Sequence, residues 1–317
     1  MTEIRKNMKA VAAGGAIVMS ALGLSAVSGV ANAADWSTTF LSINQAEYLD
    51  NFTIDDVNAA VRDDDFRLST NTRVMMRGRY ENDVFVTVGG RLLYFQHIDR
   101  TDVDSLRVGG FGNVTKKFGD FIGRIGYNGD YARRGGKDLF VENQATASLT
   151  YNPNRSYTLS ANANLGYRDF DDVNNPGLDQ VRWGTTVRAY WYPFQDATYF
   201  SASGGVLRAN AETDFQATTQ YTVGLRAGHH VTERTEISAR ASYAWKNFDS
   251  GNPAVQGGLR REDETLQAFG QVDYDYSRNV RAFAKAGVVW RDSNINNQSF
   301  TGPQAGVGVR LLFSTGR

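Results

Sequence analysis

The sequence predicts an all-β protein, a transmembrane, antiparallel, up-and-down β-barrel of about 14 strands. Three observations predict it: apolar and polar residues alternate with a period of two, the alternating segments are long, and the connections are alternately short and long. Successive side chains of a strand lie on opposite faces, so this period indicates strands with one apolar face. Barrel strands need ~9–11 residues to cross a membrane, whereas strands of soluble sandwiches usually have ~5–6.

Composition excludes several classes of protein. The 317 residues carry a formal net charge of +0 without a basic tail or block, which argues against a nucleic-acid partner. The absence of cysteine excludes disulfides, thiolate metal sites and a cysteine-linked lipid anchor. After the N-terminal segment, no stretch approaches the ~20 apolar residues of a membrane helix. The mean hydropathy of −0.41 suggests a soluble protein, but the period-two pattern contradicts that interpretation.

The first 33 residues have the pattern of a secretory signal peptide. A basic start at Arg5, Lys6 and Lys9 precedes an apolar stretch, and residues 31–33 (Ala-Asn-Ala) form a cleavage site. We expect export through the Sec system, removal of residues 1–33, and one barrel domain over residues 34–317. A transmembrane anchor is the alternative, which the short, Ala- and Gly-rich stretch disfavours.

The strands follow one another with the same pattern. In residues 157–167, Tyr, Leu, Ala, Ala, Leu and Tyr alternate with Thr, Ser, Asn, Asn and Gly, so the apolar face is aromatic at both ends. Aromatic residues at both membrane interfaces are typical of outer-membrane barrels. The alternation recurs over residues 139–151, 215–225, 237–245, 266–276 and 280–290.

The connections between these segments alternate in length, as expected for short periplasmic turns and longer extracellular loops. The tight connections are residues 81–83, 119–120, 152–155, 195–196, 232–234 and 277–279. The longer or more polar connections are residues 98–103, 134–137, 171–179, 211–214, 250–263 and 292–298.

The strand count depends on the N-terminal region. Thirteen segments lie between Phe66 and Phe313. Because bacterial single-chain barrels have even numbers of strands, we expect a fourteenth strand in residues 36–45 (WSTTFLSINQ) and a long first loop over residues 46–65. The acidic stretch YLDNFTIDDVNAAVRDDD could instead form a short helix or plug, and twelve strands then become possible.

The last strand, AGVGVRLLF, alternates Val307, Val309 and Leu311 and ends on Phe313, before Ser-Thr-Gly-Arg. This ending resembles the signal that the outer-membrane barrel insertion machinery recognises. In architecture, the chain from residue 34 onward resembles the putative β-barrel porins of the type-2 outer-membrane group, some of which accompany exopolysaccharide export. It is also similar to small monomeric fourteen-strand porins. The resemblance implies a bacterial outer-membrane location, with outer-membrane lipid and lipopolysaccharide as surroundings.

Arginines recur on the polar faces of the predicted strands. Because a charged side chain on the lipid face costs roughly 2–4 kcal/mol at mid-depth, we expect these side chains to face the interior. Fourteen strands should leave a polar, water-filled lumen. The expected pore-lining residues are Arg73, Arg77, Arg91, Arg107, Arg124, Arg182, Arg188, Arg226, Arg240, Lys285 and Arg310, with Lys246 and Arg281 also inward. The expected inward acids are fewer: Asp130, Glu142, Glu236, Asp273 and Asp275.

Some inward charges should pair across the tight turns. Counting back from residues 277–279 places Asp275 opposite Arg281, and counting back from residues 232–234 places Glu236 opposite His230. Opposite charges facing each other stabilise a hairpin modestly.

Two other alignments bring like charges together. The same counting places Arg226 opposite Arg240 and Arg73 opposite Arg91. Like charges directly opposite destabilise a sheet unless water, an acid from another strand or an anionic solute lies between them. The alternatives are an error of register, neutralisation by acidic loops, or an anion-favouring constriction built from rings of arginine.

We therefore predict a passive, anion-favouring diffusion pore for small anionic solutes or acidic oligo- or polysaccharide, without enzymatic activity, cofactor or metal. A barrel enzyme acting on lipid or protein is the first alternative, and His97 with Asp99 and Ser105 is its only candidate site. Acid clusters at residues 63–65 and 171–172 lack the spacing of a calcium loop. A barrel plugged by its loops or its N-terminal segment, acting in binding or assembly, is the second alternative.

Overall fold

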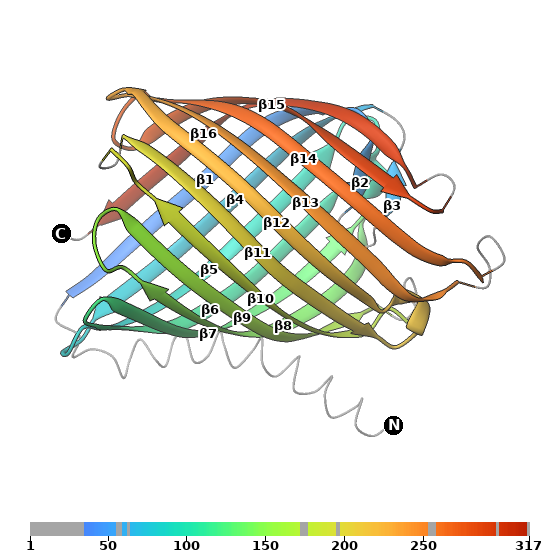
Figure 1. Cartoon of the computed structure of the whole chain (residues 1–317), viewed down its shortest axis with the longest axis horizontal. Helices are drawn as coiled ribbons and strands as arrows, with labels where there is room; N and C mark the ends of the chain where they lie inside the picture. Colours follow the sequence, from blue (N-terminus) through green and yellow to red (C-terminus); the bar gives the residue numbers. More distant parts are fainter. Residues whose placement is uncertain are drawn as a thin grey trace.

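A computed structural model describes residues 35–54, 59–61, 64–171, 177–194, 197–252, 258–295 and 298–315, so the expected signal peptide lies outside the described residues. Fourteen antiparallel strands close into one barrel (Figure 1). The predicted fold class is confirmed, and the twelve-strand alternative is wrong. The barrel strands are β1 (Asp35–Leu49), β4 (Asp65–Arg79), β5 (Val84–His97), β6 (Ser105–Phe118), β7 (Phe121–Arg134), β8 (Lys137–Tyr151), β9 (Tyr157–Phe170), β10 (Gln180–Trp191), β11 (Thr198–Ala211), β12 (Thr218–Thr232), β13 (Thr235–Gly251), β14 (Arg260–Asp275), β15 (Val280–Ser293) and β16 (Phe300–Thr315).

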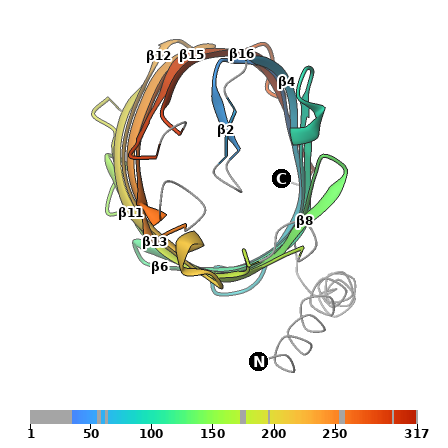
Figure 2. The ribbon, with the colours of Figure 1, turned by 90° about the vertical axis from the view of Figure 1, so that its right-hand side faces the viewer.

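The first and last strands close the barrel. β1 pairs with β16 on one side and with β4 on the other, so Phe40 lies opposite both Phe313 and Val74. The strand expected over residues 36–45 is therefore present and extends to Leu49. The following connection contains a small hairpin, in which β2 (Phe52–Ile54) pairs with β3 (Ala59–Val61). Figure 2 shows β2 running into the space that the barrel encloses.

The two ends of the barrel differ in their connections. Five of the six tight connections expected from the sequence join strands at one end, here called the short-turn end, where β1 begins and β16 ends. The sixth, residues 195–196, lies outside the described residues. The other end, the long-loop end, carries β2, β3 and two 3-10 turns, η1 (Thr101–Val103) and η2 (Asp214–Gln216). Among the described residues, no helix has the length and apolar character required to cross a membrane.

One connection at the long-loop end is shorter than expected. β7 and β8 are joined by Gly135 and Gly136 alone, with φ of 52° and 77°. Two-residue hairpin turns of this kind require positive φ at both positions, which glycine adopts without steric cost. A Cβ atom on Gly135 would also lie 2.6 Å from the carbonyl oxygen of Asp102.

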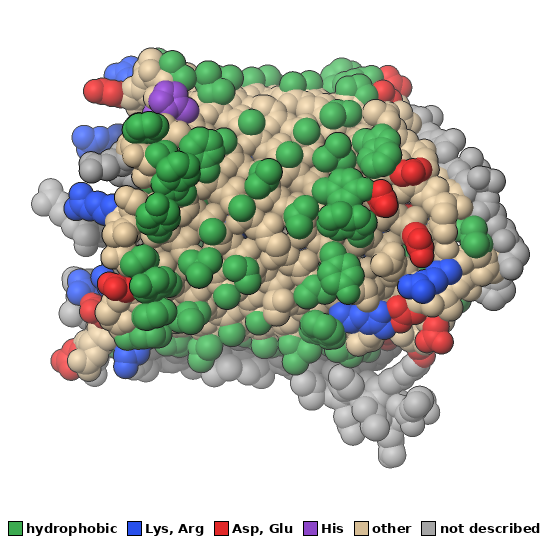
Figure 3. All heavy atoms as spheres, viewed as in Figure 1, with side chains coloured by type: hydrophobic (Ala, Val, Ile, Leu, Met, Phe, Trp, Pro, Cys, Tyr) green, Lys and Arg blue, Asp and Glu red, His purple; other side chains and the backbone are tan. Residues whose placement is uncertain are grey.

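The outer face of the barrel is apolar between two aromatic bands. At the short-turn end, Phe118 stacks on Phe121 and Phe121 on Tyr151, with ring centroids 6.0 and 4.7 Å apart. At the long-loop end, Tyr48 packs against Phe66 at 5.4 Å. Figure 3 shows hydrophobic side chains across this face, gathered in a band near the short-turn end, and charged side chains toward both ends. This distribution matches the girdles of outer-membrane barrels.

Candidate functional site: the arginine-lined interior

The pairing of the strands places the predicted arginines on the inner face. On β5 and β10, the neighbours Leu92 and Val181 are exposed on the outer face, so Arg91 and Arg182 lie on the opposite, inner face. The same alternation places every expected pore-lining residue inside the barrel: Arg73, Arg77, Arg91, Arg107, Arg124, Arg182, Arg188, Arg226, Arg240, Lys285 and Arg310.

Both expected opposite-charge pairs are present near the short-turn end. Arg281 Nε lies 2.6 Å from Asp275 Oδ1, and His230 Nε2 lies 4.0 Å from Glu236 Oε2. Arg281 Nη1 also lies 3.3 Å from the same Glu236 oxygen. These contacts form one small network on neighbouring strands, which is consistent with a structural role.

Both expected like-charge alignments are also present, so the register is correct. Arg73 lies directly opposite Arg91, and Arg226 directly opposite Arg240. Arg91 donates from Nε to Asp130 Oδ1 at 2.8 Å, so an acid from another strand neutralises one member of the first pair. Arg73 is exposed, and no carboxylate among the described residues lies within 4.0 Å of its guanidinium.

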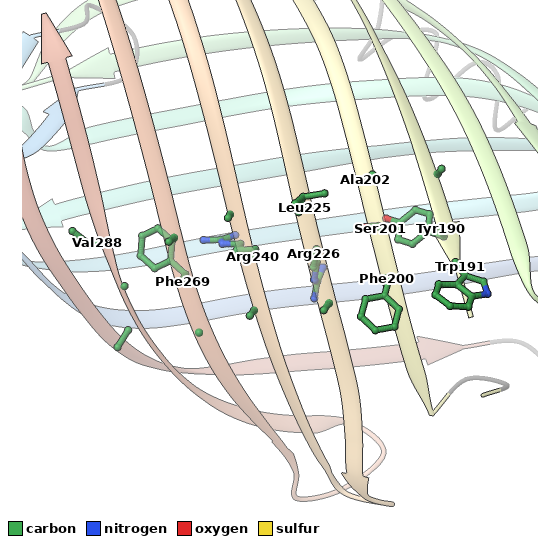
Figure 4. Close-up of a pocket in the computed structure, with 18 of the residues that line it drawn as sticks. Tyr190, Trp191, Phe200, Ser201, Ala202, Leu225, Arg226, Arg240, Phe269 and Val288 are labelled. Atoms are coloured by element: carbon green, nitrogen blue, oxygen red, sulfur yellow. The ribbon is translucent and has the colours of Figure 1, made fainter. Parts of the chain in front are cut away.

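The Arg226–Arg240 pair is held by aromatic rings. The Arg226 guanidinium lies 5.3 Å from the centre of the Tyr199 ring, and that of Arg240 lies 5.0 Å from the centre of the Phe269 ring. Figure 4 shows the two arginines side by side on β12 and β13, with Phe269 on the next strand beyond Arg240. The negative face of each ring attracts a guanidinium, so the two cations lie between the two rings. Both arginine side chains remain exposed.

At the long-loop end, the interior cations are paired with buried carboxylates. Glu142 is 5% exposed and lies 2.7 Å from Arg107 and 3.0 Å from both Arg168 and Arg182. Arg107 also lies 2.9 Å from Asp130. Three guanidinium groups from three strands therefore converge on one carboxylate, which fixes this part of the wall.

Two further clusters at this end were not expected. Glu47 lies 2.8 Å from Arg67 and 2.5 Å from Lys285, and Asp263 lies 2.8 Å from Arg261. These side chains lie on the polar faces of β1, β4 and β14 and therefore point inward. The alternation in the sequence was a signal from which this orientation could have been predicted. Inward charged residues absent from the expected set include Glu47, Arg67, Arg168, Asp263, Arg261 and Arg291.

The remaining arginines form a distinct set, here called the unpaired arginines, which has no ion pair with any carboxylate in the described part of the chain. All lie in the half of their strands nearer the short-turn end, on β4, β7, β10, β12, β13 and β16, and thus on several sides of the interior. Most are exposed, so water reaches this half of the interior. The unpaired arginines are Arg73, Arg77, Arg124, Arg188, Arg226, Arg240 and Arg310.

The candidate catalytic group has a different arrangement from the one expected. His97 Nδ1 lies 2.8 Å from Asp65 Oδ2, and both side chains are buried. Asp65 is thus a carboxylate partner of His97, and Asp99 donates its backbone N–H to Asp65 Oδ1 at 3.1 Å. Asp65 also accepts from the backbone N–H of Ile98 and thereby fixes the turn after β5.

Metal ligation finds no support in the part of the chain that the structure describes, where no group of three His, Asp or Glu side chains could hold an ion. Of the acid clusters noted in the sequence, Asp63 and Asp172 lie outside the described residues.

The C-terminal part of the chain is similar to a known protein family. Residues 190–313 match the family model described as putative beta-barrel porin 2. The predicted resemblance to the putative β-barrel porins is confirmed. The match covers the strands that carry Arg226 and Arg240, whereas no curated protein sequence matches the chain.

Solved structures with the same fold are outer-membrane proteins of low sequence identity, so the likeness concerns the fold alone. The outer-membrane channel DcaP of Acinetobacter baumannii has a TM-score of 0.54 at 10% identity, covering 88% of this chain and 97% of that chain. The anion-selective porin from Comamonas acidovorans has a TM-score of 0.52 at 9% identity, covering 88% and 100%. A loop-deletion mutant of OmpT, an outer membrane protein of Vibrio cholerae, has a TM-score of 0.51 at 9% identity, covering 88% of this chain and 100% of that chain.

Proposed function

We propose that the chain forms a porin-like pore in the bacterial outer membrane that passes small solutes by diffusion and favours anions. The observation that carries the proposal is the set of unpaired arginines, exposed on the inner face of one half of the barrel. Rings of arginine or lysine select anions, and walls of low dielectric constant strengthen the field of such charges. The proposal includes Sec-dependent export with removal of residues 1–33, and insertion by the barrel assembly machinery among lipopolysaccharide.

The barrel's orientation follows from its two ends. Short turns face the periplasm in outer-membrane barrels, and longer loops face outward. We therefore place the unpaired arginines in the periplasmic half of the lumen and the neutralised clusters around Glu142 and Glu47 in the extracellular half. An anionic solute entering from outside would reach the stronger positive field only after passing the neutralised region. Acidic oligosaccharide or polysaccharide is the solute class that we favour.

Conductance tests whether the barrel is a pore. We expect the refolded barrel, residues 34–317, to produce stepwise increases in current in a planar bilayer, because water reaches the inward arginines at the short-turn end. A barrel that inserts in its folded, heat-modifiable form yet conducts nothing would contradict the proposal and favour a plugged barrel.

The β2–β3 hairpin gives the plugged alternative its own test. Because β2 runs into the enclosed space, we expect replacement of residues 51–63 by a short Gly-Ser linker to raise the single-channel conductance. The matched control replaces residues 277–279, which connect β14 and β15 at the other end, by a Gly-Ser turn. Equal conductance in the hairpin deletion and the unmodified barrel would contradict any obstruction by β2 and β3.

The enzyme alternative is tested at His97. Because the imidazole is buried against Asp65, we expect His97→Gln to leave conductance and ion preference unchanged and to lower thermal stability. Ile237→Ala, on the outer face, serves as a stability control. A lipid or peptide hydrolase activity of the unmodified barrel that disappears in His97→Gln would instead support the enzyme.

A further inference from the structure

We propose that the inner wall of β10–β13 near the short-turn end binds a pyranose ring that carries a carboxylate. This inference rests on the proposed pore function and assigns a subsite to the acidic sugars favoured there. The subsite consists of Tyr190, Tyr192 and Tyr199 with Arg188 and Arg226, and Arg240 extends it.

The tyrosines form an aromatic cluster at the surface of the barrel wall. The rings of Tyr190 and Tyr192 are nearly parallel, at 11° and 6.0 Å between centroids, and the Tyr192 and Tyr199 centroids are 6.5 Å apart. All three side chains are half-buried, so part of each remains accessible. The C–H groups on one face of a pyranose carry partial positive charge, which suits the negative face of an aromatic ring.

Cations border this surface. Arg188 donates from Nη1 to the Tyr190 hydroxyl at 3.5 Å, and Arg226 lies 5.3 Å from the Tyr199 ring centre. Both arginines are exposed and lack a carboxylate partner among the described residues. A guanidinium presents planar paired donors that match a carboxylate. A solute bound on the rings could therefore place its carboxylate beside Arg188 or Arg226.

Hydroxyl groups complete the wall and favour a sugar over an aromatic acid. Ser201 and Thr158 lie directly opposite Tyr190 on the two neighbouring strands. Ser203 and Ser160 flank Arg188 in the same way. Hydroxyl side chains both donate and accept hydrogen bonds, so they can pair with the hydroxyls of a sugar ring, which an aromatic acid lacks.

Matched solutes test the inference. We expect glucuronate to reduce the single-channel current at a concentration roughly five- to tenfold lower than gluconate, which has the same charge without a ring. Glucose, a ring without charge, and benzoate, an aromatic acid, should both be weaker than glucuronate. Calorimetric titration of the detergent-solubilised barrel with the same solutes measures binding without requiring conductance.

Two variants separate the ring from the charge. Tyr190→Leu with Tyr192→Leu should reduce the preference for glucuronate over gluconate to about onefold while anion preference persists, because the arginines are retained. Tyr221→Leu, on the outer face and 50% exposed, is the matched control and should retain the preference.

The outcomes distinguish this inference from the pore proposal. Equal binding of glucuronate and gluconate by an anion-selective barrel would overturn the subsite and leave the pore standing. Benzoate binding as tight as glucuronate would overturn the assignment to a sugar. Cation selectivity would contradict the proposed pore, whereas preferential glucuronate binding in calorimetry would still support the subsite.

Discussion

Reversing the charges of Arg226 and Arg240 together is expected to abolish or invert the preference of the pore for anions. The two guanidiniums lie opposite each other, exposed, between Tyr199 and Phe269. Exchange of two positive for two negative charges changes the local charge by four units, in a lumen whose walls focus the field. The reversal potential under a salt gradient measures the change. It should be recorded near 0.1 M salt, where the Debye length is about 10 Å.

A control outside the lumen separates luminal charge from total charge. Arg234 lies in a short turn and is exposed, so Arg234→Glu changes the charge of the protein without entering the lumen. We expect its reversal potential to match that of the unmodified barrel. Equal reversal potentials in the double variant Arg226→Glu, Arg240→Glu and in the control Arg234→Glu would show that the Arg226–Arg240 pair does not set ion selectivity.

Replacing Glu142 by Gln is expected to produce the largest loss of stability. Its carboxylate is 5% exposed and neutralises Arg107, Arg168 and Arg182, each within 3.0 Å. Removing one partner of a buried ion pair leaves the other charges uncompensated and costs roughly 3–5 kcal/mol. Urea unfolding of the barrel in lipid vesicles, followed by tryptophan fluorescence, measures the free energy of unfolding.

The control for this variant is Glu233→Gln, in an exposed short turn, which should change the free energy of unfolding by less than ~0.5 kcal/mol. A loss in Glu142→Gln as small as that of the control would show that water, rather than Glu142, screens the three arginines. Arg73→Gln should also be nearly neutral for stability, because Arg73 has no carboxylate partner among the described residues.

Period-two alternation and turn spacing were sufficient to predict the barrel, its strand number and its register. The strand over residues 36–45 was inferred from the requirement for an even number and is β1. Counting from the 232–234 turn placed Arg226 opposite Arg240, because antiparallel pairing fixes every position once the turn is known. The two-residue β7–β8 turn was missed because its glycine pair was assigned to a longer loop.

The neutralisation of the long-loop half could not be predicted in the same way. Glu142 on β8 pairs with Arg107 and Arg182, each two strands away, and such contacts depend on barrel curvature and side-chain rotamers rather than on direct opposition. The partner of His97 was likewise assigned to the neighbouring Asp99 because sequence proximity was the only guide. In the fold, cross-strand pairing brings Asp65 to the imidazole.

The reversal potential of the unmodified barrel in a planar bilayer, with a tenfold gradient of potassium chloride, tests the central claim most directly. Unpaired arginines on the inner face predict a potential displaced toward the equilibrium potential of chloride. A displacement toward the equilibrium potential of potassium would contradict an anion-favouring lumen.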